Sequence, residues 1–110
     1  MSKKVAVIMG SDSDLDTMRP CIQRLKSFGI STEVHIISAH RTPAAAEDFA
    51  SHAEENGFGV IIAAAGKAAH LAGVLAAYTT LPVIGVPIKT SMIQKISALR
   101  KINQVIRYYG

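Results

Sequence analysis

Three short polar stretches of this 110-residue sequence hold most of the side chains that could do chemistry. Each follows an apolar run: residues 10–14 (Gly-Ser-Asp-Ser-Asp), residues 38–41 (Ser-Ala-His-Arg) and residues 66–70 (Gly-Lys-Ala-Ala-His). A glycine-serine turn before a helix offers N–H groups and hydroxyls to a phosphate, although the same turn also serves as an ordinary helix cap. An arginine can hold a phosphate or carboxylate through paired hydrogen bonds. Together the stretches predict a ligand site that can hold a phosphate or a carboxylate.

His40 is the side chain whose type best suits proton transfer, because imidazole titrates near neutrality and can both give and take a proton. A solvated loop histidine is the alternative interpretation. The neighbouring Ser38 and Arg41 favour a functional one. Asp12 and Asp14 would repel a phosphate that they faced. One of them is therefore expected to cap the following helix or to accept hydrogen bonds from sugar hydroxyls.

The elements that must position these stretches alternate regularly along the chain. Apolar runs predict strands, and helical spacing of apolar residues, with capping residues and terminal glycines, predicts the helices between them. Strands are expected at 5–9, 32–38, 60–65 and 83–86, and helices after residue 14 up to Phe28, from Thr42 to about 56–57, and at 71–78. Such alternation is typical of a parallel sheet with helices on both faces and right-handed crossovers. The polar stretches then meet at the carboxyl ends of the strands, where open parallel sheets bind ligands.

The last part of the chain has a different pattern. Apolar residues fall at helical spacing and cations lie between them; the apolar positions are Met92, Ile93, Ile96, Leu99, Ile102, Val105, Ile106 and Tyr109. A basic amphipathic helix can lie on a membrane or bind a partner groove, and it can also simply cover a face of the sheet. We divide the chain into a core at residues 1–90 and a basic amphipathic tail at residues 91–110.

Composition narrows the class of protein further. Hydrophobic residues make up 49% of the chain and charged ones 18%, a balance that argues against disorder. Five of the twelve cations lie after residue 88, without an acid among them, so the net charge of +4 does not indicate a nucleic-acid-binding face. The chain lacks a run of about 18 apolar residues, the length that a membrane helix needs. The first apolar run, Val5–Met9, is too short for a signal peptide and is followed by acids instead of a small-residue cleavage site, so a cytoplasmic location is expected.

Cysteine and histidine spacing predicts neither a disulfide nor a metal centre. Cys21 is the single cysteine, so an intrachain disulfide is excluded. We interpret it as a buried small hydrophobic residue. His35 and His52 are interpreted as structural, and no spacing of potential ligands indicates a metal site.

Four segments resemble a known family over about residues 4 to 90. They are Val7–Asp14 (Val-Ile-Met-Gly-Ser-Asp-Ser-Asp), Ser38–Pro43 (Ser-Ala-His-Arg-Thr-Pro), Gly66–Gly73 (Gly-Lys-Ala-Ala-His-Leu-Ala-Gly) and Thr80–Pro87 (Thr-Leu-Pro-Val-Ile-Gly-Val-Pro). In order and spacing they resemble the N5-carboxyaminoimidazole ribonucleotide mutases of bacterial purine (IMP) biosynthesis. The second and third segments favour this branch over the related carboxylases that use free carbon dioxide.

The resemblance implies a flavodoxin-like three-layer α/β/α sandwich, a parallel sheet of at least four strands and a homo-octamer. It implies an isomerase that moves a carboxylate from an exocyclic nitrogen to ring carbon 4, with neither cofactor nor metal. His40 would shuttle the proton. By motif position, the phosphate would be held by Ser11, Ser13 and Arg41, and the ribose by Asp14. The remaining pocket residues would be Ser38, Ala39, Gly66, Lys67, Ala68, His70 and Leu71.

The sequence departs from the family pattern in places. Lys67 stands where many members have glycine, and Ala72 replaces a frequent proline. After about Ser91 the family continues with a Gly-Asp-Ser-Leu-like loop, a Gln-Met-Pro segment, a fifth strand and a long helix, which the text of residues 92–110 does not resemble. The chain is thus expected to be truncated relative to the family.

Two alternatives to an active mutase stay open at this point. A relative with impaired catalysis could keep the ribonucleotide pocket after losing the family's C-terminal region. A flavin or signalling domain could also use this architecture. However, Ala63–Ala65 stands where a phospho-receiver needs an aspartate, and the three polar stretches lack the aromatic side chains that stack on a flavin.

Overall fold

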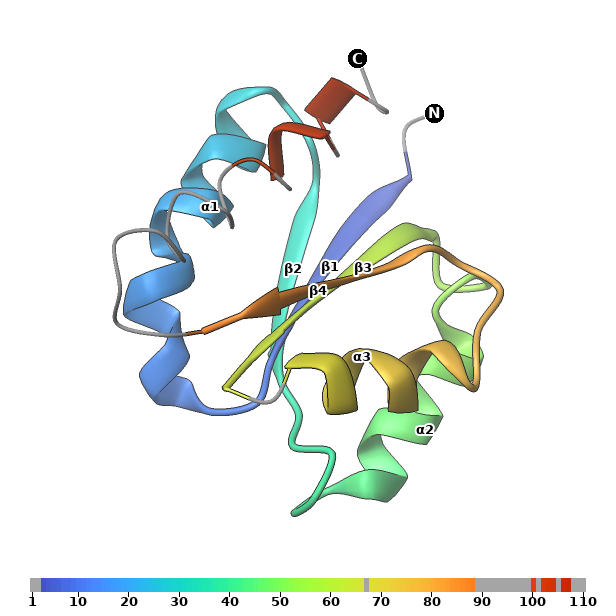
Figure 1. The fold of residues 1–110 in the computed structure, drawn as a ribbon. Coiled ribbons are helices and arrows are strands. Elements are labelled where there is room, and N and C mark those ends of the chain that lie inside the picture. The colour runs from blue at the N-terminus through green and yellow to red at the C-terminus, as the bar shows by residue number, and fades with distance from the viewer. Residues whose placement is uncertain (1–2, 67, 89–99, 101, 105, 108–110) are drawn as a thin grey trace.

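A parallel sheet of four strands forms the centre of the computed structural model (Figure 1). The structure describes residues 3–66, 68–88, 100, 102–104, 106 and 107. The strands lie in the order β2-β1-β3-β4 and are β1 (Lys4–Met9), β2 (Thr32–Ile36), β3 (Phe58–Ala65) and β4 (Val83–Pro87). All three pairings are parallel, as the alternation of elements predicts.

Helices cover both faces of this sheet (Figure 1). A 3₁₀ turn, η1 (Asp12–Asp14), leads into α1 (Leu15–Ser27), which covers one face. The other face is covered by α2 (Pro43–His52) and α3 (Ala68–Ala76). The described part of the chain is therefore a flavodoxin-like three-layer sandwich, as expected. Within it, no helix has the length and apolar character needed to cross a membrane.

Strand β1 supplies side chains to both layers of the core. Val5, Val7 and Met9 pack with α1, whereas Ala6 and Ile8 pack with α2 and α3. This division follows from the alternation of side chains along a strand. All five are fully buried, which explains why the strand reads as a continuous apolar run.

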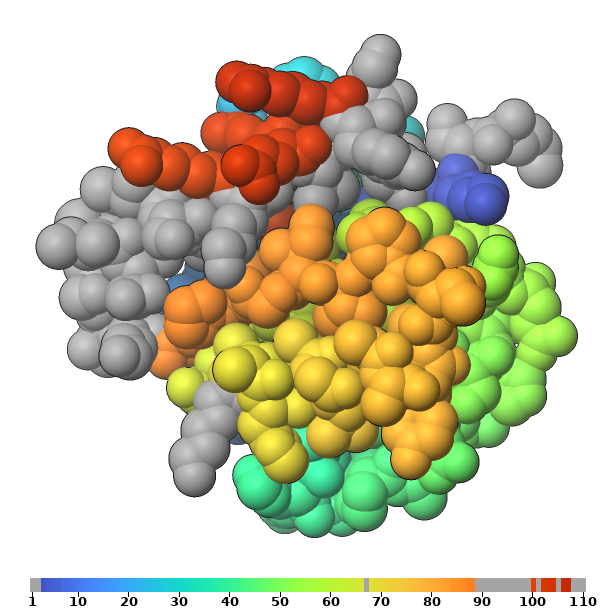
Figure 2. Space-filling model, turned by 45° about the vertical axis from the view of Figure 1, so that its right-hand side comes forward, coloured from blue at the N-terminus to red at the C-terminus, as the bar shows by residue number. Residues whose placement is uncertain are grey.

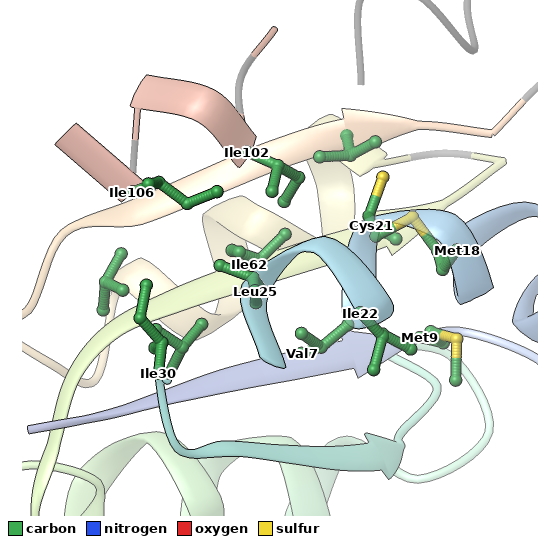
Figure 3. Packing of buried hydrophobic residues seen from close by; sticks show 14 residues of the cluster. Val7, Met9, Met18, Cys21, Ile22, Leu25, Ile30, Ile62, Ile102 and Ile106 are labelled. Carbon is green, nitrogen blue, oxygen red and sulfur yellow. The ribbon is translucent and has the colours of Figure 1, made fainter. Parts of the chain in front are cut away.

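The described residues near the C-terminus add a second helical segment to the α1 layer. Residues 100, 102–104, 106 and 107 are helical. Ile102 and Ile106 are 0% and 9% exposed and point into the cluster that contains Leu25 of α1 (Figure 3). In this part the amphipathic pattern covers a face of the sheet. The other positions of the predicted stripe (Met92, Ile93, Ile96, Leu99, Val105 and Tyr109) lie outside the described residues.

Several predicted boundaries shift by a few residues. Strand β2 ends at Ile36 rather than at residue 38, because Ser38 is drawn into a hydrogen-bonded turn with Thr42. Helix α2 ends at His52 rather than at residues 56–57, and the turns that follow reach Gly57, whose φ of +91° suits glycine. Helix α3 begins at Ala68 rather than at residue 71.

Candidate active site

The carboxyl ends of β1, β2 and β3 surround a cavity of about 240 Å³. The chain places β2 on one side of β1 and β3 on the other, so the connections diverge at this edge. Such a divergence opens a crevice beyond the strand ends, and ligands of open parallel sheets bind there. The lining residues come from all three polar stretches and from the neighbouring Ala65 and Leu71; they are Gly10, Ser11, Asp14, Ser38, Ala39, His40, Ala65, Gly66, His70 and Leu71.

Ser11 organises the loop after β1. Its hydroxyl accepts a hydrogen bond from the Ser13 backbone N–H at 3.3 Å and lies 3.0 Å from the Ser13 hydroxyl. Ser11 therefore caps η1, whereas the sequence led us to expect that one of the two aspartates would cap the following helix or accept from sugar hydroxyls. The side chain of Asp14 makes no capping hydrogen bond at the start of α1, and this residue lines the cavity. Asp14 is thus placed to meet a ligand.

The Asp14 carboxyl has a pKa above its usual value. Partial burial is the main cause, because it disfavours the charged form, and the nearby Asp12 carboxylate adds repulsion. A hydrogen bond with the Ser11 backbone acts in the opposite direction. The raised pKa shows that the folded chain holds this charge at a cost, which a hydrogen-bond donor on a ligand would reduce.

The loop after β2 is closed by hydrogen bonds between Ser38 and its neighbours. The Ser38 hydroxyl accepts from the Arg41 N–H at 3.0 Å. The Thr42 hydroxyl accepts from the Ser38 N–H and donates to the Ser38 carbonyl, both at 3.0 Å. These bonds fix a tight turn that leaves His40 exposed at its tip. Pro43 then starts α2 at the position where its missing N–H costs least.

The rings of His40 and His70 stack on each other at the wall of the cavity. Their ring centroids are 4.5 Å apart and their planes differ by 8°. The two rings come from different elements: His40 from the loop after β2 and His70 from the first turn of α3. In Figure 2 the blue-green segment after β2 lies beside the yellow start of α3. Because each imidazole can donate or accept a proton, the pair places acid and base groups at the cavity wall.

Arg41 faces a second hollow rather than the histidine cavity. This groove of about 350 Å³ is lined by Gly10, Ser11, Asp12, Ile36, Ser38, Arg41 and Thr42. It adjoins the first cavity because both share Gly10, Ser11 and Ser38. The combined surface has a guanidinium at one end and two imidazoles at the other. Such an arrangement suits an elongated ligand with an anionic group at one end.

Most of the predicted site residues come together in the structure. Eight of them line the cavity: Ser11, Asp14, Ser38, Ala39, His40, Gly66, His70 and Leu71. Ser13 contacts the Ser11 hydroxyl and lines neither hollow, and Arg41 lines the adjoining groove. Ala68 does not join them, because its methyl group is buried where α3 approaches Gly85. Lys67 lies outside the described residues.

Two residues that line the cavity, Gly10 and Ala65, are not among the predicted site residues. Gly10 lies in the polar turn directly after β1, and this position in the sequence could have identified it as a cavity residue. Ala65 ends an apolar strand and carries no functional group. Its place in the cavity wall becomes visible only in the structure, where the end of β3 lies beside the end of β1.

The histidines interpreted as structural do lie outside the cavity. The His35 ring packs on Phe49 with centroids 4.8 Å apart and lies 3.2 Å from the Glu33 carboxylate. His52 is exposed at the end of α2, where a hydrogen bond to the Asp48 carbonyl, more than nearby carboxylates, raises its pKa. Among the described residues, no group of three or more His, Cys, Asp or Glu side chains is placed to hold a metal ion.

Comparison with known proteins gives consistent matches. The sequence model of the family described as AIR carboxylase matches residues 4–107. N5-carboxyaminoimidazole ribonucleotide mutase of Thermotoga maritima is 52% identical over 102 residues, which cover 93% of this chain and 60% of that protein. The Pyrococcus horikoshii mutase is 52% identical over 101 residues, covering 92% and 57%. The crystal structure of Treponema denticola PurE superposes with a TM-score of 0.68 at 25% identity, over 86% of this chain and 61% of that one.

The matches cover most of this chain but only part of each curated relative. The chain spans about 60% of the length of the curated relatives. The family match itself reaches residue 107 and so includes most of the segment that we set apart at residues 91–110, whose separate status stays a prediction. Because the family model matches nearly all of the sequence, this chain belongs to the AIR carboxylase family.

Proposed function

We propose that this chain binds a carboxylated 5-aminoimidazole ribonucleotide and moves its carboxylate from the exocyclic nitrogen to ring carbon 4. The observation that carries the proposal is the stacked His40–His70 pair at the wall of a cavity shared with Ser11, Asp14 and Ser38. Membership of the AIR carboxylase family supports the substrate class. Relatives that are about half identical carry the name N5-carboxyaminoimidazole ribonucleotide mutase.

In the proposed reaction His40 serves as general acid and then as general base. The bond between the exocyclic nitrogen and the carboxylate carbon breaks, carbon dioxide is released into the cavity, and His40 gives a proton to the nitrogen. Carbon 4 then attacks the trapped carbon dioxide, and His40 takes the proton that carbon 4 loses. Atoms and charge balance within the substrate and one imidazole, so the step needs no cofactor. A closed site makes recapture effectively intramolecular.

We assign the two hollows to the two ends of this substrate. Ser11, Ser13 and Arg41 are assigned to the phosphate, because hydroxyls and a guanidinium suit an anion; Asp12 lines the same hollow and must point away from a bound phosphate. Asp14 is assigned to the ribose hydroxyls, which can donate to its carboxylate. The imidazole ring and carboxylate then lie near His40 and His70, with Ser38, Ala39, Gly66 and Leu71 as the remaining wall.

Binding without catalysis is the second candidate function. It needs the same cavity, in which Ser11, Asp14 and Ser38 can bind a ligand without any proton transfer. A homo-oligomer, octameric as the family resemblance implies, and a cytoplasmic location are part of the first proposal. In either case the ligand is the same phosphorylated ribonucleotide.

The proposal is tested by a mutase assay and a binding measurement on this chain, on His40→Asn and on His52→Asn. The unsubstituted chain is expected to turn over, and His40→Asn is expected to lose about 10²- to 10⁴-fold in rate. Its affinity for 5-aminoimidazole ribonucleotide is expected to stay within about tenfold, because asparagine keeps the shape and removes only the proton shuttle. His52 is exposed on α2, away from the cavity, and serves as the matched control.

Three other results have definite meanings. Loss of binding in His40→Asn as large as the loss of rate contradicts the acid/base role. Ribonucleotide binding without turnover by the unsubstituted chain selects the second candidate function. Failure to bind the ribonucleotide at all contradicts both.

A further inference from the structure

We propose that Gly10 and Ala65 form a positioning pair that sets the width of the crevice between the loops after β1 and β3. The inference rests on the proposed function, since it concerns how that site holds its ribonucleotide. Both residues line the cavity, yet neither has a side chain that can bind or react. Their small size would leave room between the two loops, and their contact would set the distance between those loops.

The contact between these two residues is close. The Gly10 N–H donates to the Ala64 carbonyl at 3.0 Å, which ties the end of β1 to the end of β3. A β-carbon added at Gly10 would lie 3.1 Å from the Ala65 β-carbon. Gly29 and Gly57 have positive φ, whereas Gly10 does not. Gly10 is therefore required for room and not for backbone conformation.

Ala65 is held on its other side and cannot move away from an enlarged residue 10. It pairs with Pro87 of β4, and its carbonyl accepts from the Ile88 N–H at 2.9 Å. Ala65 is the last residue of β3, a strand that is buried along most of its length. A side chain at residue 10 is therefore expected to displace the loop that follows β1, which carries Ser11 and Asp14.

This displacement has a selective consequence for ligands. The loop after β1 carries Ser11 and Asp14, which are assigned to the phosphate and ribose, whereas Gly66 and His70 follow β3. A ligand held on this loop moves with it and keeps its contacts to Ser11 and Asp14, while Arg41, on the loop after β2, stays in place. A ribonucleotide that spans the crevice loses its fit, because small misplacements between two parts of a site are costly.

The test compares Gly10→Ala, Ala65→Gly, the double variant and Gly73→Ala. Affinities for 5-aminoimidazole ribonucleotide and for ribose 5-phosphate are measured by calorimetry, and folding is checked by thermal unfolding. Gly10→Ala is expected to weaken ribonucleotide binding about tenfold and ribose 5-phosphate binding less than about twofold. In the double variant the nearest Ala65 atom left is the α-carbon at 4.0 Å, so ribonucleotide affinity is expected to return. Gly73→Ala is the matched control, because an added β-carbon there meets nothing within 4 Å.

Several outcomes overturn the inference. Equal losses for both ligands in Gly10→Ala show general damage, and unchanged ribonucleotide affinity shows that the clearance is unimportant. A double variant no better than Gly10→Ala rules out the pairing with Ala65. If Gly10→Ala does not fold, the double variant decides: folding with restored affinity supports the pair, and failure overturns it. Absence of ribonucleotide binding by the unsubstituted chain overturns the proposed function itself.

Discussion

The buried strands and the loops at their carboxyl ends follow opposite rules of construction. Strand β1 is fully buried from Val5 to Met9, and the described residues include no buried polar or charged side chain. Immediately beyond the strands, Ser11, His40 and Arg41 are exposed. Stability thus depends on apolar packing in one region, and ligand chemistry depends on polar groups in the other. Substitutions in the core should therefore change stability and spare ligand binding, and substitutions in the loops should change ligand binding and spare stability.

The largest expected effect on stability lies in the α1 layer. Leu25 is fully buried in the cluster shown in Figure 3. Leu25→Ala is expected to lower the free energy of unfolding by about 2–5 kcal/mol, because it removes buried methyl groups and leaves a cavity. The measurement is denaturant unfolding, with ribonucleotide affinity determined under conditions where the variant is folded.

A matched control for this substitution lies on the same helix. Gln23 is exposed, and Gln23→Ala is expected to change stability by less than about 0.5 kcal/mol. The folded fraction of Leu25→Ala should bind the ribonucleotide normally. A large affinity loss in folded Leu25→Ala would break the separation between core and site.

An intermediate effect is expected at the anionic end of the site. Arg41→Ala is expected to weaken ribonucleotide binding about ten- to a hundredfold, since hydrogen bonds from a charged donor to a phosphate are strong. Stability should change little, because Arg41 is exposed. Arg19→Ala is the control, as this exposed arginine pairs with Asp16 at 3.2 Å on α1. An unchanged dissociation constant in Arg41→Ala would refute the phosphate assignment.

The smallest effect is expected for Asp14→Asn, which should raise stability and lower ribonucleotide affinity. The raised pKa of Asp14 means that its ionisation lowers stability as pH rises from about 4 through the folded-state value. Asp14→Asn removes this penalty and is expected to stabilise the fold at pH 7 by less than about 1 kcal/mol. The gain should vanish at pH below the unfolded-state pKa. Ribonucleotide affinity should fall meanwhile, because a neutral amide accepts ribose hydroxyls more weakly.

The stability prediction is checked by thermal unfolding of Asp14→Asn and of the unsubstituted chain at several pH values. The affinity prediction is checked by calorimetry with the ribonucleotide at pH 7. A variant that is less stable at neutral pH would contradict the burial argument. Unchanged affinity would remove Asp14 from the ribose site.

The sheet, its layers and the position of the site follow from local signals in the sequence. Runs such as Val5–Met9 indicate buried strands, and parallel strands bring their carboxyl ends to one edge. Other features depend on tertiary placement. The stacking of His40 on His70 joins a loop to a helix 30 residues further along the chain, and the burial of Ala68 reflects the start of α3 against Gly85. The clearance between Gly10 and Ala65 involves no chemical group, so composition gives no sign of it.

The end of β2 shows a subtler limit. The apolar run through Ile37 predicts a strand that reaches residue 38, but Ser38 and Thr42 form local hydrogen bonds that compete with the strand. Similarly, Ser11 caps η1 although two aspartates beside it are equally good capping types. In such cases residue propensities indicate several residues that could end a strand or cap a helix, and the tertiary structure determines which one does.

The central claim, that His40 exchanges a proton with ring carbon 4, is most directly tested by hydrogen isotope exchange. 5-Aminoimidazole ribonucleotide is incubated in D₂O with the chain or with His40→Asn, and deuterium at carbon 4 is followed by NMR. The unsubstituted chain is expected to accelerate exchange above the uncatalysed rate, and His40→Asn, with ribonucleotide still bound, is expected to leave it at that rate. Equal acceleration by both proteins, or acceleration by neither, would contradict the assignment of His40.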